Sequence, residues 1–186
     1  MFENIKKSIQ TIGKFSEEEL ALFIDRLKTI SLVKDDCLLS EGKICQSIYF
    51  VIKGCFRHYY ISEEGDEVTL NLLVENDWVL DYSSLTSQKP STAIIQASEE
   101  SEVFELSVYD LHALIRISDT FFQIARIFQF AIEQQEIKTQ KTSPRKKYAF
   151  ILVNKPKMIQ RFPLKYIASY LDMTPETLSR VRRSIT

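Results

Sequence analysis

The sequence predicts an α+β fold, in which a small β jelly roll is followed by a long helix and then by two short helices around a tight turn. Three observations support this prediction. Eight short apolar runs separated by turn residues fill 31–107, apolar residues recur at helical spacing over 119–141, and a two-helix pattern fills 162–183. The corresponding domains are 1–118, 119–142 and 143–186.

Helices are expected first, over residues 2–28. Ser16 and Glu19 have the spacing of a capping box, and an apolar helical face follows them. The strand-like runs then read SLV, CLLS, SIYFVIKG, CFRHYYIS, EVTLNLLV, WVLDY, STAIIQAS and SEVFELS. Pairs such as Glu41-Gly42 and Lys53-Gly54 mark turns between them, which is typical of a jelly roll or small barrel.

A long helix with two apolar stripes is expected over 119–141, after a shorter helix that Ser107 can cap. The first stripe has the spacing of four and three that is typical of a coiled-coil seam, and it consists of Phe121, Ala125, Phe128 and Ile132. The second stripe consists of Ile124, Ile127 and Ala131. One stripe can face the barrel and the other a partner helix. The alternative is that both stripes are core of a monomer, because the heptad run is short.

The stretch FPLKYIASYLDMTPETLSRVRR, residues 162–183, has the pattern of a helix-turn-helix. Leu164, Ile167, Ala168 and Leu171 form one apolar face, Asp172 and Met173 interrupt it, and Thr174 with Pro175 begins a second helix. Asp tolerates the left-handed backbone that such a turn often requires. The second helix of this motif enters the major groove of DNA. The alternative is a helical hairpin of another bundle, whose arginines form a solvated face.

Charge is distributed asymmetrically along the chain. Residues 138–186 carry 12 Lys or Arg against 2 Asp or Glu, and the remainder carries 12 against 23, so the net charge of −1 hides a basic end on an acidic body. Because the basic end coincides with the two-helix motif, the distribution favours a polyanion as the partner of that end.

Metal, membrane and enzyme functions are disfavoured by the composition. Cys37, Cys45 and Cys55 form no CxxC pair, and His58 and His112 add no ligand cluster, so we expect no metal, no cofactor and no metal-dependent barrel enzyme. The apolar runs are too short to cross a membrane, and the first residues, MFENIKKSIQ, lack a secretory apolar core. We therefore expect a cytoplasmic protein with no membrane partner.

The order of barrel, long helix and helix-turn-helix resembles the Crp/Fnr family of bacterial transcription regulators, in particular a subgroup common in the Bacteroidetes. The stretches LLSEGKICQSIYFVIKGCFRHYYISEEGDEVTLNLL and KPKMIQRFPLKYIASYLDMTPETLSRVRR carry this resemblance. It implies a cyclic-nucleotide-binding-type β jelly roll, a dimerisation helix and a winged helix-turn-helix-type domain. The implied partners are double-stranded DNA with a palindromic operator, a second copy of the chain, and RNA polymerase as a further candidate.

The resemblance also implies which residues contact DNA. Glu176 and Arg180 match family positions that read bases, whereas Pro175 stands where the family carries a further base-reading arginine. The set expected at the DNA comprises Thr174, Glu176, Thr177, Ser179, Arg180, Arg182 and Arg183. Among these, Arg182 and Arg183 are expected mainly to hold phosphate.

The ligand pocket departs from the family pattern and is expected to be degenerate. Where the family has Gly-Glu, this chain has Leu80-Asp81, and Ser91 stands in place of the phosphate-binding arginine, before Thr92-Ala93. Lys89 is the nearby residue that could substitute for the missing charge. We therefore predict that cAMP is not the effector, and that an effector, if the barrel takes one, is another small molecule. The alternative function is a small-ligand-binding barrel protein whose C-terminal helices contact other proteins.

Overall fold

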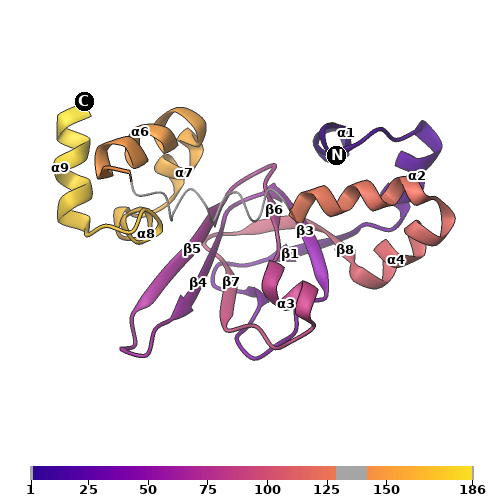
Figure 1. The fold of residues 1–186 in the computed structure, drawn as a ribbon, viewed down its shortest axis with the longest axis horizontal. Coiled ribbons are helices and arrows are strands. Elements are labelled where there is room, and N and C mark those ends of the chain that lie inside the picture. The colour runs from indigo at the N-terminus through magenta and orange to yellow at the C-terminus, as the bar shows by residue number, and fades with distance from the viewer. Residues whose placement is uncertain (1, 129–141, 186) are drawn as a thin grey trace.

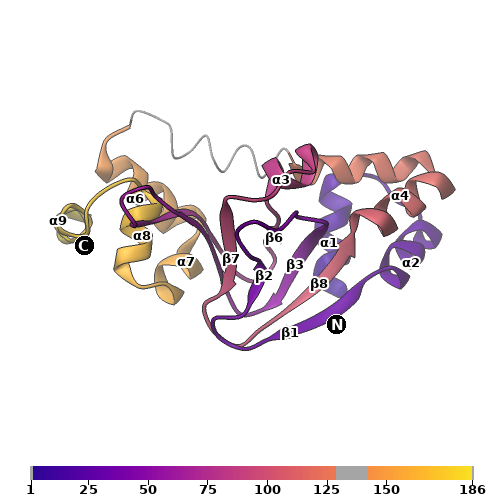
Figure 2. The same ribbon diagram turned by 90° about the horizontal axis from the view of Figure 1, so that it is seen from below.

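The computed structural model describes residues 2–128 and 142–185. A β-sandwich forms its centre, with helices α1 (Glu3–Ile12), α2 (Glu17–Asp25) and α4 (Val108–Ile117) at one end (Figure 1). Helices α6 (Pro144–Asn154), α7 (Pro156–Arg161), α8 (Leu164–Tyr170) and α9 (Pro175–Ile185) cluster at the other end, as Figure 2 also shows. This mixed architecture confirms the predicted fold class.

The sandwich consists of two four-stranded antiparallel sheets. One has the order β1 (Lys28–Leu32), β8 (Ser101–Ser107), β3 (Ser47–Lys53), β6 (Trp78–Val79), and the other has the order β2 (Cys37–Leu39), β7 (Ala93–Ala97), β4 (Phe56–Ile61), β5 (Glu67–Leu73). Each of the eight strand-like runs in the sequence overlaps one of these strands. Apart from the β4–β5 hairpin, the paired strands are not consecutive in sequence, so long-range pairing closes the sandwich.

Strand β5 contains a bulge opposite β4. His58 pairs with Asn71, but the next residue of β4, Tyr59, pairs with Thr69, so Leu70 is an extra residue without a counterpart. Residues that pair directly across a sheet share a face. Asn71 therefore lies on the face of His58, whereas Thr69 lies on the face of Tyr59.

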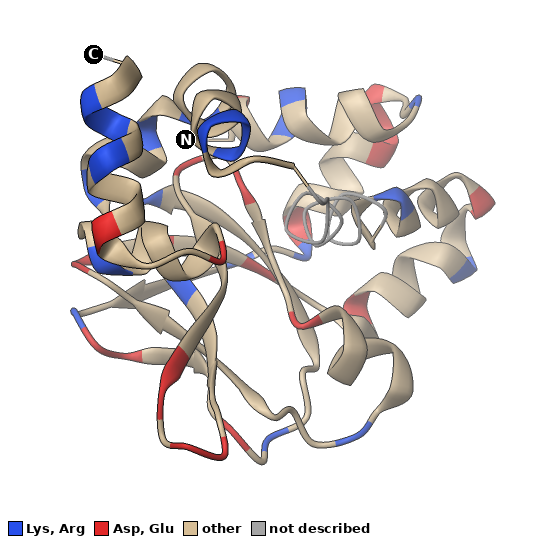
Figure 3. Ribbon diagram, turned by 60° about the vertical axis from the view of Figure 1, so that its left-hand side comes forward, with Lys and Arg blue, Asp and Glu red and all other residues tan. Residues whose placement is uncertain are grey.

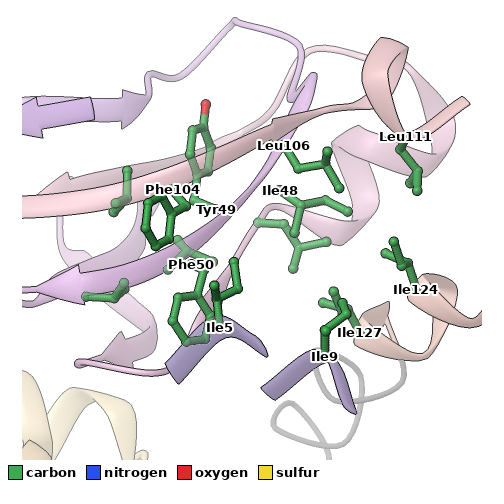
Figure 4. Packing of buried hydrophobic residues seen from close by; sticks show 14 of the residues in the cluster. Ile5, Ile9, Ile48, Tyr49, Phe50, Phe104, Leu106, Leu111, Ile124 and Ile127 are labelled. Atoms are coloured by element: carbon green, nitrogen blue, oxygen red, sulfur yellow. The ribbon is translucent and has the colours of Figure 1, made fainter. Parts of the chain in front are cut away.

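The main core lies between one sheet and the N-terminal helices. Ile48 and Phe50 of β3 and Phe104 and Leu106 of β8 meet Ile5 and Ile9 of α1, and all six side chains are buried (Figure 4). Burying each of them contributes roughly 1.5–3 kcal/mol. The predicted capping box begins α2, because the Ser16 hydroxyl accepts from the Glu19 amide and the Glu19 carboxylate accepts from the Ser16 amide.

The predicted helix over 119–141 begins differently from the expectation. Residues Asp119–Ala125 form a 3-10 helix, η1, and residues 129–141, including the seam residue Ile132, lie outside the described residues. Phe121, Ile124 and Ile127 are fully buried in the barrel core. Phe121 and Ile124 are three residues apart within η1, which has three residues per turn, so they share its buried face, whereas the predicted seam assumed 3.5 residues per turn. The assignment of Phe121 to an exposed dimer seam is therefore wrong.

Helix α3 (Tyr82–Ser87) is an element that the sequence analysis did not anticipate. The run WVLDY was expected to be a strand, but only Trp78–Val79 is one. Asp81 ends the extended segment because its carboxylate accepts from the Ser84 amide, 3.1 Å away, and so caps α3.

The C-terminal residues 142–185 fold as helices only, and no wing strand occurs among them. Ser143 caps α6, with Pro144 in the first turn, as its sequence predicts. Tyr148, Ile151, Met158, Phe162, Ile167 and Leu178 form the buried interior of this helical cluster. This core is separate from the one that contains α1.

Candidate nucleic-acid interface and effector pocket

Helices α8 and α9 form the predicted helix-turn-helix. Ile167 and Ala168 of α8 and Leu178 of α9 are fully buried, so the two helices cross over small and aliphatic side chains. Asp172 has a φ of 55°, which is the left-handed conformation predicted for this position. The amide of Met173 then donates to the Ala168 carbonyl at 3.0 Å, which ties the turn to the end of α8.

Helix α9 starts at the cap that the sequence predicts. The Thr174 hydroxyl accepts from the Thr177 amide at 3.2 Å, and Pro175 is the first helical residue. Hydrogen bonds to its own backbone amide and to Thr174 lower the pKa of the Glu176 carboxyl below its ordinary value. Glu176 is therefore ionised at neutral pH and can act as a hydrogen-bond acceptor.

The exposed face of α9 carries the predicted DNA contacts. Glu176, Arg180 and Arg183 follow one another at helical spacing and are exposed, as are Thr174 and Arg182. Thr177 and Ser179 are half-buried, because they lie beside the face that packs on α8. Figure 3 shows the resulting band of basic residues along α9, with an acidic residue near its start.

Helix α6 adds basic residues beside α9 that the residue-level predictions omitted. Arg145 donates to the Ser184 carbonyl at 3.5 Å, and Lys147 donates to the Leu171 carbonyl at 3.2 Å. Arg145 and Lys146 are exposed. The run RKK belongs to the basic excess of residues 138–186, so the sequence contained the signal, but only the fold brings it next to α9.

Two of the residues predicted to line the ligand pocket, Asp81 and Ser91, are hydrogen bonded to each other. Leu80, Asp81 and Ser91 are buried, whereas Thr92 is exposed. The Ser91 hydroxyl donates to the Asp81 carboxylate and accepts from the Ala93 amide at 2.9 Å. Lys89, the residue that could replace the missing arginine, is exposed at a loop. No positive side chain is found at Asp81 or Ser91 in the contacts of the described residues.

A pocket of about 230 Å³ lies between α1, strands β4 and β5, and the segment that contains β6. Ser8 and Thr11 line it from α1, and His58, Asn71 and Trp78 line it from the strands. The Trp78 indole donates to the Ser8 hydroxyl at 2.9 Å, which closes one side. Asp77 also borders the pocket, and burial raises the pKa of its carboxyl, with the charge of Lys155 acting in the opposite direction.

The residues that the structure describes contain three free cysteine thiols but neither a cluster of metal ligands nor a helix that could span a membrane. These residues contain no group of three or more His, Cys, Asp or Glu placed to hold a metal ion. The thiols of Cys37, Cys45 and Cys55 are unpaired, the first exposed and the other two buried. Among residues 2–128 and 142–185, no helix has the length and apolarity needed to cross a bilayer.

The sandwich and the exposed recognition helix together define a class of protein, in which an effector-type barrel is joined to a helix-turn-helix. Residues 29–118 match the family model of the cyclic nucleotide-binding domain. Together with the relatives below, this match makes the chain similar to transcription regulators of the Crp/Fnr family.

Named relatives agree with this assignment. The chain is 28% identical to the fumarate and nitrate reduction regulatory protein of Yersinia pestis, over 92% of this chain and 73% of the relative. It is 24% identical to the cAMP-activated global transcriptional regulator CRP of Salmonella typhimurium, over 52% of this chain and 49% of the relative. FixK2 from Bradyrhizobium japonicum shares the fold, with a TM-score of 0.67 and 19% identity over 86% of this chain and 84% of that structure.

Proposed function

We propose that this chain regulates transcription by reading a palindromic DNA operator as a homodimer. The observation that carries the proposal is the exposed stripe of Glu176, Arg180 and Arg183 on α9, opposite the buried anchor Leu178. Both Glu176 and Arg180 lie in the first half of the helix, the part of a recognition helix that reaches base edges. Arg pairs bidentately with guanine, and an ionised Glu can accept from the amino group of cytosine.

Selection from random oligonucleotides, followed by titration with variants, tests this reading. Arg180→Ala should lose about 1–3 kcal/mol of preference for the selected site while keeping its affinity for random DNA. Arg183→Ala should weaken binding to every sequence and lower the salt slope by about one unit. Arg116→Ala, an exposed cation on α4, is the matched control and should change neither quantity. Equal losses of Arg180→Ala on specific and random DNA would contradict its role in base reading.

The proposed dimer surface lies along η1 and differs from the seam first expected. Phe122 is 59% exposed, Ala125 is exposed and Phe128 is half-buried. These side chains border an apolar hollow of about 500 Å³, whose floor includes Leu111 and Ile115 of α4. A second copy, related by two-fold symmetry, would cover the same patch on both protomers. RNA polymerase remains a candidate partner that a regulator bound to DNA would meet.

Sedimentation of a charged variant tests the dimer. Phe122→Glu should yield a monomer with poor operator binding, because a buried unpaired carboxylate opposes association. Tyr109→Glu is the control, since Tyr109 is 78% exposed and lies outside the apolar hollow. An unchanged mass for the Phe122→Glu protein would remove this surface from the proposal.

The proposed effector is a small molecule other than cAMP. Ser91 stands where the resemblance implies a phosphate-binding arginine, and its hydroxyl bonds the Asp81 carboxylate, whose negative charge would repel a cyclic phosphate. The neighbouring pocket of Ser8, Thr11, His58 and Asn71 offers polar groups without a lysine or arginine in its lining. Isothermal titration with millimolar cAMP and cGMP should show no binding. A dissociation constant in the low micromolar range for either would contradict the proposal, and Lys89→Ala would then show whether that lysine supplies the charge.

A further inference from the structure

The outer face of strands β4 and β5 contacts the helix-turn-helix domain and forms a surface that we call the docking face. It consists of Cys55, Arg57, Tyr59, Glu67, Thr69, Leu72 and Val74. Figure 1 and Figure 2 both place α8 next to β5. Cys55, Leu72 and Val74 belong to the same buried cluster as the interior of the helical domain. The two halves of the chain therefore share apolar core at this face.

Arg57 is the buried cation at the centre of the docking face. Only 4% of Arg57 is exposed, and its Nε donates to the Thr69 hydroxyl at 3.0 Å, while Nη1 pairs with the Glu67 carboxylate. Its guanidinium lies between two rings, 4.3 Å from the centre of Tyr59 and 3.8 Å from the centre of Tyr166. Tyr166 belongs to α8, so one side of the enclosure around this charge comes from the DNA-binding half.

Polar contacts surround this centre on both sides. The Thr69 amide donates to the Ser169 hydroxyl of α8 at 2.9 Å. At the other edge, Arg161 of α7 pairs with Glu75 at 2.9 Å and with Glu99, and Lys157 lies 3.6 Å from Glu75. Charge-assisted contacts of defined geometry restrict relative orientation more strongly than apolar contact alone. The docking face therefore specifies how α8 lies on the barrel.

We propose that Arg57 is a positioning residue for DNA recognition, which fixes α8 on the barrel and thereby sets the separation of the two recognition helices in the dimer. This inference rests on the proposed function. Helix α8 packs directly on α9 through Ile167, Ala168 and Leu178, so a fixed α8 gives a fixed α9. A dimer whose two recognition helices are held at a fixed separation binds half-sites at one spacing, about one helical turn or 34 Å apart. A dimer whose recognition helices are loosely attached to the barrels also binds half-sites at other spacings.

The main experiment compares operators of different half-site spacing. Inserting about half a turn of DNA between the half-sites should cost the native protein at least about tenfold in affinity, because one rigid dimer cannot engage both. Arg57→Ala should bind the original operator more weakly, but it should lose less than about threefold on insertion. Lys53→Ala removes an exposed cation of strand β3, in the other sheet, that pairs with Glu100, and this variant should behave like the native protein.

Two buried thiols provide a direct readout of docking. Cys55 is 1% exposed at the docking face, whereas Cys45 is 2% exposed in the barrel core. Loss of docking should accelerate labelling of Cys55 by a thiol reagent by about tenfold or more and leave Cys45 protected. If Arg57→Ala exposes both thiols, its barrel has unfolded, and Tyr166→Ala, which alters the opposite side of the contact, supplies the comparison.

The outcomes separate the inference from the function on which it rests. If Arg57→Ala and Tyr166→Ala both keep the native spacing preference and the native protection of Cys55, the positioning role is overturned. DNA recognition would remain in place. Failure of the native protein to bind any selected DNA would overturn the proposed function and the positioning role together. Relaxed spacing with accelerated Cys55 labelling and a protected Cys45 would establish the inference.

Discussion

Removal of the Ser91 hydroxyl, a single oxygen atom, should lower the free energy of unfolding of the barrel by several kcal/mol. In the native structure this hydroxyl donates to the buried Asp81 carboxylate and accepts from the Ala93 amide. A hydrogen bond to a charged group contributes about 1.5–3 kcal/mol and a neutral one about 1 kcal/mol. Because the two contributions share one group and are not strictly additive, Ser91→Ala should cost about 2–4 kcal/mol in the free energy of unfolding.

Thermal unfolding followed by circular dichroism measures this loss. For a chain of this size the cost corresponds to a decrease in Tm of roughly 5–10 °C. Thr92→Ala is the matched control, because Thr92 is the exposed neighbour, and it should change Tm by less than about 2 °C. Equal Tm values for the two variants would refute the reasoning, since Asp81 would then be satisfied by solvent and the phosphate subsite would be open to a ligand.

Three further predictions concern the thiols, acid sensitivity and the helix cap. Ellman's reagent should label exposed Cys37 in the native protein, Cys55 only after undocking or unfolding, and Cys45 only after unfolding, because the last two thiols are buried away from the reagent. Burial alone would raise the pKa of Glu75, but its backbone hydrogen bonds and Arg161 together lower it below the ordinary 4.5. Docking should therefore keep its full strength above about pH 4.5 and weaken as the pH falls through the lower folded value, with faster Cys55 labelling in acid and a flatter profile in Glu75→Gln. Thr174→Ala should lower operator affinity by about fivefold, measured by fluorescence anisotropy, because loss of a helix cap costs about 1 kcal/mol.

The sequence was most informative where local chemistry decides the structure. Hydroxyl caps at Ser16, Ser107, Ser143 and Thr174 all begin helices, and Asp172 adopts the left-handed backbone expected in the turn. These features depend on residues within one turn of each other, so spacing along the chain is enough to identify them.

The errors arose where tertiary packing overrides a local pattern. Phe121 fits a heptad seam by spacing, but the tighter 3-10 winding places it in the barrel core with Ile124. Helix α3 is not predicted, because its cap, Asp81, lies within the run WVLDY, which has the pattern of a strand. No sequence signal identified Arg57, because Glu67 is 10 residues away and Tyr166 lies in the other half of the chain.

The bulge at Leu70 makes one polar stripe serve two purposes. Strict alternation along EVTLNLL would place Glu67, Thr69 and Asn71 together on one side of the strand, with Val68, Leu70 and Leu72 on the other. The extra residue divides that stripe, so Asn71 borders the pocket while Glu67 and Thr69 hold Arg57 against the DNA-binding half. One extra residue in β5 therefore decides which face of the sheet each of these polar side chains occupies. Deleting Leu70 would keep Asn71 on one face and Glu67 and Thr69 on the other. A shift of the β4–β5 register by one residue would instead place Glu67 and Thr69 on the inner face. Arg57 would then be buried without its hydrogen-bond acceptors.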